Sequence, residues 1–144
     1  MINKFKSQKA IPFLRWAGGK KWFVKNISYF LPENGFQNYH EPFLGGGAIY
    51  FHLNPKHKSF LNDLNSELIE TYHCIKENVN GVLEELKKFK NSEDFYYKIR
   101  ASIYQSDIKR AARFIYLNQT SFNGIYRVNL KGEYNVPYGY RSKN

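Results

Sequence analysis

The sequence has little cysteine and no long apolar run, and each absence excludes a class of protein. The single cysteine, Cys74, has no partner for an internal disulfide and excludes a zinc site built on several cysteines. No apolar stretch approaches the roughly 20 residues of a membrane-spanning helix. The first residues contain no apolar signal core and no small-residue cleavage site. We therefore expect a soluble, globular, cytoplasmic protein that does not bind membranes.

Positive charge is in excess, and it is unevenly placed. Residues 1–25 hold seven Lys and Arg and no acidic residue, and residues 94–144 hold nine against three acidic residues. Residues 26–93 hold six basic residues against nine acidic ones. Basic ends of this kind favour a polyanionic partner, and the aromatic content of 18% suits stacking on bases. A generic solvated basic protein is the alternative.

Residues 21–78 have the pattern of an α/β domain. A helix is predicted over residues 21–31, ended by Pro32 and Gly35. Next come a strand over 37–43, a glycine turn at 45–47, a helix over 48–53, a strand over 58–63 and a helix over 64–78. The strand–helix–strand order predicts a parallel sheet.

From residue 79 onward the pattern becomes helical. Helices are predicted over 79–89, 94–104 and 107–118, followed by a hairpin within 124–136 that turns at Lys131 and Gly132. We therefore predict two parts: an α/β part over residues 1–78 and a helical and hairpin part over residues 79–144.

The glycine turn and the acid after the second strand predict a nucleoside-containing ligand. A strand that ends in glycines before a helix exposes backbone to a ligand, and Asp63 ends the next strand, where it can accept hydrogen bonds from ribose hydroxyls. An ordinary turn, with Asp63 as a helix cap, is the alternative. Tyr50 stands where a dinucleotide fingerprint needs its third glycine, which disfavours NAD and FAD. The P-loop sequence is also absent.

Five sequence blocks stand in order along the chain: FLRWAGGK at 13–20, EPFLGGGA at 41–48, LNDLN at 61–65, YLNQTSFNGIYR at 116–127 and NVPYG at 135–139. In this order they resemble the motifs of the Dam-type (D12 class) DNA adenine-N6 methyltransferases. The resemblance covers nearly the whole chain. It implies a Rossmann-like S-adenosylmethionine-dependent methyltransferase fold with a partial parallel sheet, in which residues 1–78 bind the cofactor and residues 79–144 form the helical and β-hairpin target-recognition region.

The resemblance also implies roles for particular residues. Those matching the cofactor motifs, and so expected to bind S-adenosyl-L-methionine, are Trp16, Lys20, Glu41, Phe43, Gly45, Gly47 and Asp63. For Trp16 the alternative is a core aromatic, and for Lys20 a solvated lysine. Those matching the DNA-contacting hairpin are Phe122, Asn123, Ile125 and Arg127, with Tyr138 and Tyr140 as further candidates. Core packing for Phe122 and a plain surface charge for Arg127 are the alternatives.

Arg127 has the side chain best suited to bidentate contact with guanine. The expected substrate is double-stranded DNA with a short palindromic site, GATC being the leading candidate. Repair marking, restriction–modification and phage self-protection all use this chemistry, and the sequence does not choose among them.

The family's Asp-Pro-Pro-Tyr type motif, which holds the flipped adenine, is absent, because the chain contains no adjacent prolines. We therefore expect an incomplete or split methyltransferase with no catalytic residue in this chain and little activity alone. Such a chain would associate with a complementary C-terminal chain or with itself. A non-catalytic DNA- or cofactor-binding subunit is the alternative, and a nucleotide-dependent oxidoreductase is a third reading, opposed by Tyr50.

Overall fold

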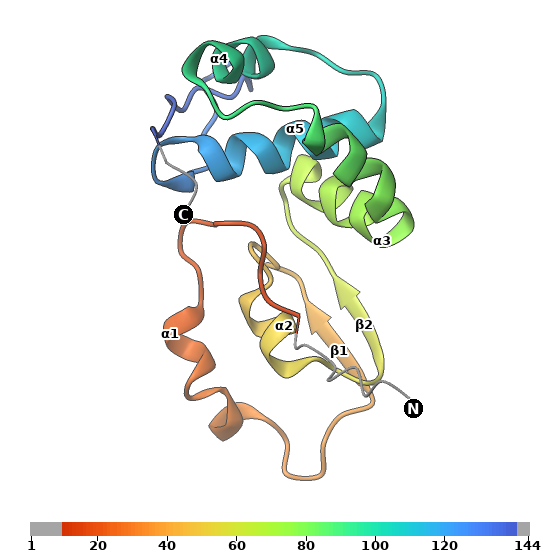
Figure 1. Ribbon diagram of the computed structural model, residues 1–144. Coiled ribbons are helices and arrows are strands. Elements are labelled where there is room, and N and C mark those ends of the chain that lie inside the picture. The colour runs from red at the N-terminus through yellow and green to blue at the C-terminus, as the bar shows by residue number, and fades with distance from the viewer. Residues whose placement is uncertain (1–9, 141–144) are drawn as a thin grey trace, which may run out of the picture. The chain divides into compact units, whose positions relative to one another are not determined.

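The computed structural model describes residues 10–140, which form two compact units (Figure 1). The sheet unit comprises residues 10–13 and Gly18–Asn62. The helical unit comprises Leu14–Ala17 and residues 63–140. Within the described residues, no helix combines the length and apolar character that a bilayer crossing needs.

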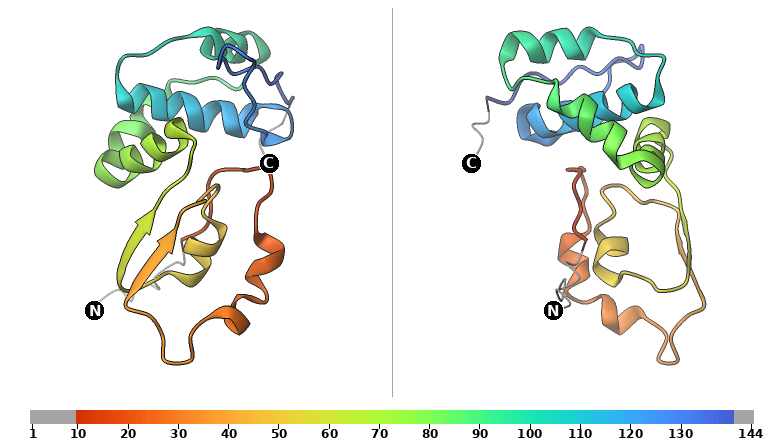
Figure 2. Two further views of the ribbon diagram at one scale, coloured as in Figure 1. Left: turned by 180° about the vertical axis from the view of Figure 1, so that it is seen from behind. Right: turned by 45° about the vertical axis from the view of Figure 1, so that its right-hand side comes forward.

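The sheet unit contains the predicted parallel pair of strands. β1 (Asn38–Glu41) pairs with β2 (Lys58–Leu61) in parallel, with His40 opposite Phe60. Successive side chains of a strand point to opposite faces. One face is covered by α2 (Ala48–Leu53), where Tyr39 packs against Tyr50 at 6.1 Å (Figure 2). On the other face the rings of His40 and Phe60 stack at 4.6 Å.

The prediction of one helix over residues 21–31 is wrong, because the structure has two shorter elements there. The structure has a single α-helical turn, α1 (Lys21–Val24), followed by a 3-10 turn, η1 (Ile27–Phe30). Neither element has a side-chain cap or an acidic residue in its first turn, and Asn26 between them leaves helical geometry at ψ 4°. Helices this short depend on such end contacts, because nucleation is costly.

The helical unit is built on three helices: α3 (Ser66–Lys87), α4 (Glu93–Ala101) and α5 (Asp107–Thr120). α3 and α5 pack against each other, and α4 packs on α5 (Figure 1). A short 3-10 turn, η2 (Phe122–Gly124), follows α5. The core of the helical unit contains Tyr96, Ile99, Tyr116, Leu117, Tyr134, Val136 and Tyr138.

α3 joins two helices that the sequence predicts as separate. Asn78 has non-helical geometry (φ −150°, ψ 64°), and its Oδ1 accepts a hydrogen bond from the Gly81 N–H at 2.9 Å. The side chain thus caps the second segment at the kink. α3 therefore runs across the predicted boundary at residue 78, whereas the two compact units divide between Asn62 and Asp63. The functional division at residue 78 stays a prediction.

The predicted hairpin is present but has a three-residue loop. Val128 forms an antiparallel bridge with Tyr134, and the Asn129 N–H donates to the Glu133 carbonyl at 2.9 Å. The loop is residues 130–132, and Gly132 is in the left-handed region at φ 79°. A three-residue loop ending in a left-handed glycine is a common hairpin connection.

Candidate cofactor and DNA-recognition sites

The glycine turn is fixed to the ends of both strands. The Asn62 N–H donates to the Glu41 carbonyl at 2.9 Å, and the Leu44 N–H donates to the Asn62 carbonyl at 2.8 Å. Gly45 and Gly47 both have positive φ, at 53° and 69°, and Gly47 is followed directly by α2. The turn is therefore a defined shape at the carboxyl ends of parallel strands, where α/β sheets bind ligands.

Lys20 supports this turn. Its Nζ donates a hydrogen bond to the Phe43 carbonyl at 2.9 Å. The Phe43 side chain is 73% exposed, while its neighbour Leu44 is buried. Four predicted cofactor residues of the sheet unit, Lys20, Phe43, Gly45 and Gly47, therefore lie in or against one turn.

Glu41 is the buried carboxylate of the sheet unit. Its side chain is 6% exposed, and its Oε2 accepts a hydrogen bond from the Tyr39 hydroxyl at 2.7 Å. Its Oε1 is buried without a hydrogen-bond partner in the described part of the chain. Burial raises the pKa of Glu41, and the Tyr39 bond and the charge of Lys20 offset part of that rise. An unpartnered buried acceptor is costly, so this oxygen suits a ligand that donates a hydrogen bond.

Asp63 is the first residue of the helical unit after β2, and it does not cap α3 directly. Its Oδ1 accepts from the Asn65 N–H at 3.0 Å. Asn65 is the N-cap, and its Oδ1 accepts from the Leu68 N–H at 2.9 Å. The alternative interpretation of Asp63 as the helix cap is therefore wrong, because Asn65 has that role.

Trp16 belongs to an aromatic stack in the helical unit. Its ring lies 5.4 Å from that of Tyr126 and 6.3 Å from that of Phe114, with interplanar angles of 22° and 27°. Tyr126 is in turn held by Glu67, whose Oε2 accepts from the Tyr126 hydroxyl at 2.8 Å. Trp16 is half-buried, so the stack gives it a packing role, and its predicted contact with a cofactor stays a prediction.

Asn118 is a site residue that the sequence reasoning did not single out. It is 1% exposed and lies on α5, where its amide hydrogen-bonds both backbone groups of Arg15. Its Nδ2 also donates to the Gly124 carbonyl at 3.3 Å. Asn118 thus binds the Trp16 segment and the loop that follows α5 to one helix.

The predicted DNA residues after α5 are mostly exposed. Phe122 is 54% exposed, Ile125 is 37% exposed, and Asn123 lies on the surface in the left-handed region at φ 54°. Arg15 is also exposed, and its side chain packs over Gly124, which is the residue between Asn123 and Ile125 in the sequence. The structure therefore brings a cation from a distant part of the sequence to this loop.

Tyr138 differs from the other predicted DNA residues because it is buried. It is 7% exposed, belongs to the core, and donates its hydroxyl hydrogen bond to Asn91 Oδ1 at 2.9 Å. Its ring packs edge-on against Tyr140, which is 70% exposed. Burial disfavours a direct base contact by Tyr138, whose placement fits a structural role.

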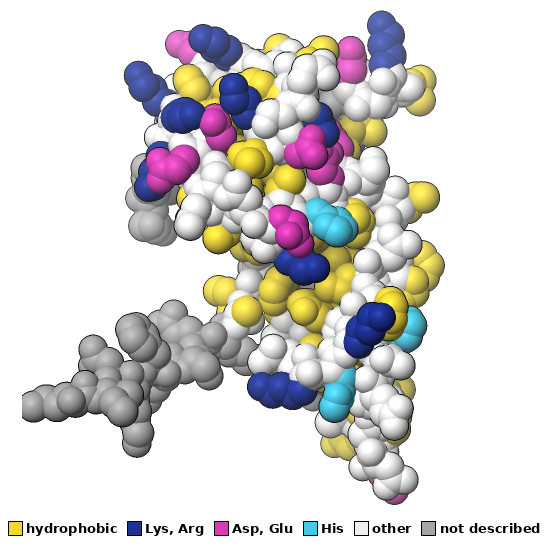
Figure 3. Space-filling view, turned by 90° about the vertical axis from the view of Figure 1, so that its right-hand side faces the viewer, with side chains coloured by type: hydrophobic (Ala, Val, Ile, Leu, Met, Phe, Trp, Pro, Cys, Tyr) yellow, Lys and Arg dark blue, Asp and Glu magenta, His cyan; other side chains and the backbone are white. Residues whose placement is uncertain are grey.

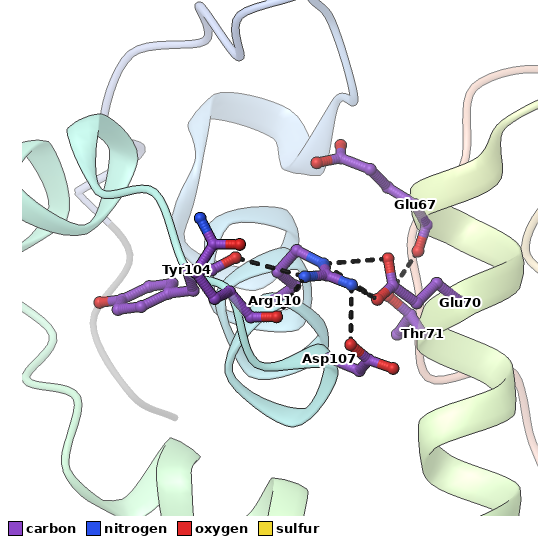
Figure 4. Close-up of polar contacts among 7 residues, drawn as sticks. Glu67, Glu70, Thr71, Tyr104, Asp107 and Arg110 are labelled. Carbon is purple, nitrogen blue, oxygen red and sulfur yellow. Dashed lines mark hydrogen bonds and ion pairs between the residues drawn. The ribbon is translucent and has the colours of Figure 1, made fainter.

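The largest ionic cluster of the helical unit joins α5 to α3 (Figure 4). The Arg110 guanidinium is paired with both carboxylate oxygens of Glu70 and with Asp107 at 2.8 Å. It also donates to the Gln105 carbonyl at 2.6 Å. With its donors committed to these acceptors, Arg110 is a structural cation rather than a site for a further anion.

Basic and acidic side chains are mixed on the helical unit in the view of Figure 3. Three of the seven basic residues in the N-terminal region, Lys4, Lys6 and Lys9, lie outside the described residues, as do Arg141 and Lys143. The structure therefore tests the predicted basic surface only in part.

Comparisons with known proteins give a consistent set of relatives. The family model for D12 class N6 adenine-specific DNA methyltransferase matches residues 16–144. The chain is 43% identical over 141 residues to Type II methyltransferase M1.LlaDCHI of Lactococcus lactis subsp. cremoris. The matched region covers 92% of this chain and 49% of that protein. The chain is 41% identical over 154 residues to Type II methyltransferase M.MjaIII of Methanocaldococcus jannaschii, covering 92% and 53%.

A third relative is a DNA adenine methylase of Haemophilus influenzae, 38% identical over 135 residues, covering 89% of this chain and 46% of that protein. The chain thus spans about half the length of the curated relatives it matches.

Proposed function

Because the chain belongs to the D12 class of N6 adenine-specific DNA methyltransferases, we propose that it supplies the cofactor-binding and DNA-recognition parts of such an enzyme. The reaction is transfer of a methyl group from S-adenosyl-L-methionine to N6 of adenine in double-stranded DNA. The parallel β1–α2–β2 unit suits the beginning of a Rossmann-like methyltransferase sheet.

Glu41 carries the cofactor part of the proposal. Its buried, unpartnered Oε1 lies at the carboxyl end of β1, next to the glycine turn. The ammonium group of the methionine portion would supply both a hydrogen-bond donor and a compensating positive charge. Lys20 fixes the turn through the Phe43 carbonyl, so that Gly45 and Gly47 present backbone to the same end of the ligand.

The remaining cofactor residues belong to the helical unit. We assign the ribose hydroxyls to Asp63 and a packing contact with the cofactor to Trp16. Support for both comes from the family's sequence blocks. The chain's own side chains then position the methyl donor, and transfer depends on orientation and charge rather than on a covalent enzyme intermediate.

The DNA part of the proposal is carried by the exposed loop and hairpin that follow α5. Phe122 offers an exposed ring for stacking on or wedging between bases, and Ile125 an apolar contact. Asn123 and Arg127 offer donors that can read base edges, with a short palindrome such as GATC as the target.

Exposed aromatics of the sheet unit suit a further protein surface. Trp22, Tyr29 and Phe30 are 73%, 84% and 68% exposed, and Phe23 packs between two of them. Because the relatives are about twice as long, we propose that a complementary C-terminal part, or a second copy, covers these rings. Sedimentation of the 144-residue chain as a stable monomer with no tendency to associate would contradict this.

Calorimetric titration of the chain with S-adenosylmethionine, NAD and duplex DNA tests the proposed function. We expect binding of S-adenosylmethionine and DNA, loss of cofactor binding in Glu41→Gln, and no binding of NAD. Binding of NAD without S-adenosylmethionine would favour an oxidoreductase. DNA binding without any cofactor binding would favour a DNA-binding subunit.

A further inference from the structure

The hairpin after α5 places Arg127 and Asn135 directly opposite each other. The Asn135 N–H donates to the Arg127 carbonyl at 3.1 Å, one position from the Val128–Tyr134 bridge. Residues opposed in this way lie on one face of an antiparallel pair, so that their side chains can interact.

The Asn135 residue occupies one edge of the Arg127 guanidinium. Arg127 Nε donates to Asn135 Oδ1 at 2.8 Å, and Arg127 Nη2 donates to the Asn135 carbonyl at 3.3 Å. A guanidinium has five N–H donors in a fixed fork. The edge formed by Nε and Nη2 is therefore used, while the outer edge formed by Nη1 and Nη2 keeps a donor on each nitrogen.

The hairpin also leaves the positive charge of Arg127 without a paired carboxylate. The one acidic residue of the hairpin, Glu133, accepts a hydrogen bond from Asn129 Nδ2 at 2.8 Å. Within the described part of the chain, Arg127 forms no ion pair, and its side chain is exposed. Asn129 thus hydrogen-bonds the Glu133 carboxylate, while Asn135 hydrogen-bonds the Arg127 guanidinium.

We propose that Asn135 is a positioning residue that fixes the Arg127 guanidinium so that its outer edge reads guanine through O6 and N7. The inference rests on the proposed function, because it takes DNA as the ligand. Pre-orientation of a flexible arginine reduces the ordering entropy lost on binding and favours the geometry of a bidentate contact. Asn135 then contributes to discrimination between bases without touching a base.

Fluorescence anisotropy with the full 144-residue chain tests this inference. The probes are a duplex containing GATC, duplexes with each base pair changed in turn, and a duplex in which 7-deazaguanine removes the N7 acceptor. Arg127→Ala should lower discrimination at one guanine by roughly 5- to 150-fold. Asn135→Ala should lower it at the same guanine by roughly three- to tenfold.

Two further variants separate positioning from other roles. Asn135→Asp keeps the acceptor for Arg127 Nε, so discrimination should persist, while the added negative charge weakens binding to all duplexes and reduces the salt slope by about one. Asn129→Ala is the matched control in the same hairpin. It removes the hydrogen bonds of the Asn129 side chain to Lys131 and Glu133, and it should leave discrimination at the guanine read by Arg127 unchanged.

The double variant Arg127→Ala/Asn135→Ala gives the decisive comparison. If Asn135 acts through Arg127, its replacement causes no further loss of discrimination once Arg127 is gone. A further loss in that background would overturn the inference, because Asn135 would then read the base itself. Unchanged discrimination in Asn135→Ala with an intact circular dichroism spectrum would also overturn it, leaving the proposed function standing. Equal binding of the wild-type chain to all duplexes would overturn both.

Discussion

Asn118 holds Arg15 by both of its backbone polar groups. Asn118 Oδ1 accepts from the Arg15 N–H at 2.9 Å, and Asn118 Nδ2 donates to the Arg15 carbonyl at 2.7 Å. This pairing replaces the hydrogen bonds that a neighbouring strand would provide. Together with the Trp16 stack, it ties Leu14–Ala17 to the helical unit, although the chain on both sides belongs to the sheet unit.

Replacement of Asn118 by Ala should therefore destabilise the helical unit. The change leaves the buried Gly124 carbonyl and the partly buried backbone groups of Arg15 without their partner, at a cost of about 1–3 kcal/mol. Urea denaturation measures this loss, and hydrogen exchange should show that the Arg15 amide loses protection. Asn26→Ala, at an exposed position without a side-chain cap bond, is the control. Equal stability of the two variants would show that the Asn118 bonds contribute nothing net.

Gly124→Ala and Gly132→Ala form a matched pair. Both glycines have positive φ, at 63° and 79°, which an L side chain adopts at a cost of about 1–2 kcal/mol. A Cβ at Gly132 meets no atom within 4 Å, whereas one at Gly124 meets the Arg15 side chain and, at 3.1 Å, the Asn118 carbonyl. We expect Gly124→Ala to lower the free energy of unfolding at least twice as much. Similar values for the two variants in urea titrations would contradict the close packing of Arg15 on Gly124.

The buried Glu41 carboxyl should make stability fall as pH rises. Its pKa is raised from the ordinary value of 4.5 by burial, so the folded protein keeps a proton that the unfolded chain has released. The contribution is complete below pH 4.5 and is lost as pH rises through the raised pKa of the folded state. Glu41→Gln should remove this part of the pH dependence of the melting temperature. Glu33→Gln, at an exposed position, should leave it in place.

The same carboxyl links pH to cofactor affinity. If Glu41 receives the ammonium group in its ionised form, binding of S-adenosylmethionine releases a proton over the same pH range. Affinity should then rise with pH, and the heat of binding should vary with the ionisation enthalpy of the buffer. A heat that is the same in all buffers would argue against this contact.

Phe122 and Tyr138 should respond oppositely to substitution. Phe122→Ala removes an exposed ring and should weaken DNA binding without lowering the melting temperature. Tyr138→Phe removes the hydrogen bond to Asn91 and should cost about 0.5–1.5 kcal/mol of stability while leaving DNA affinity unchanged. If Tyr138→Phe weakened DNA binding without any loss of stability, Tyr138 would contact DNA, and the structural role would be contradicted.

The sequence predicted the parallel arrangement of β1 and β2 and the extent of α2 because local signals agree there. Gly47 precedes α2 and Pro55 follows it, and a strand lies on each side. Prediction failed at residues 21–31, where apolar spacing suits a helix but no cap supports one. The break predicted between residues 78 and 79 coincides with the kink at Asn78, but the structure continues as one helix, α3, across it.

The two asparagines with the clearest structural roles were not predicted. Asn118 and Asn135 stand within sequence blocks that carry the family resemblance, but a block does not say what its residues contact. The partner of Asn118 is 103 positions away in the chain, and that of Asn135 is an arginine side chain across the hairpin. Such roles depend on tertiary contacts, which local propensity and spacing do not encode.

The placement of Leu14–Ala17 in the helical unit has a consequence for the order of events during synthesis. Asn118 and Tyr126, which bind this tetrapeptide, leave the ribosome more than a hundred residues after it. Closing so long a loop is entropically costly and slows folding. The helical unit therefore cannot be completed from its own helices as they appear. Its first-synthesised segment can dock only after Asn118 and Tyr126 have emerged, and until then Trp16 lacks its stacking partner Tyr126.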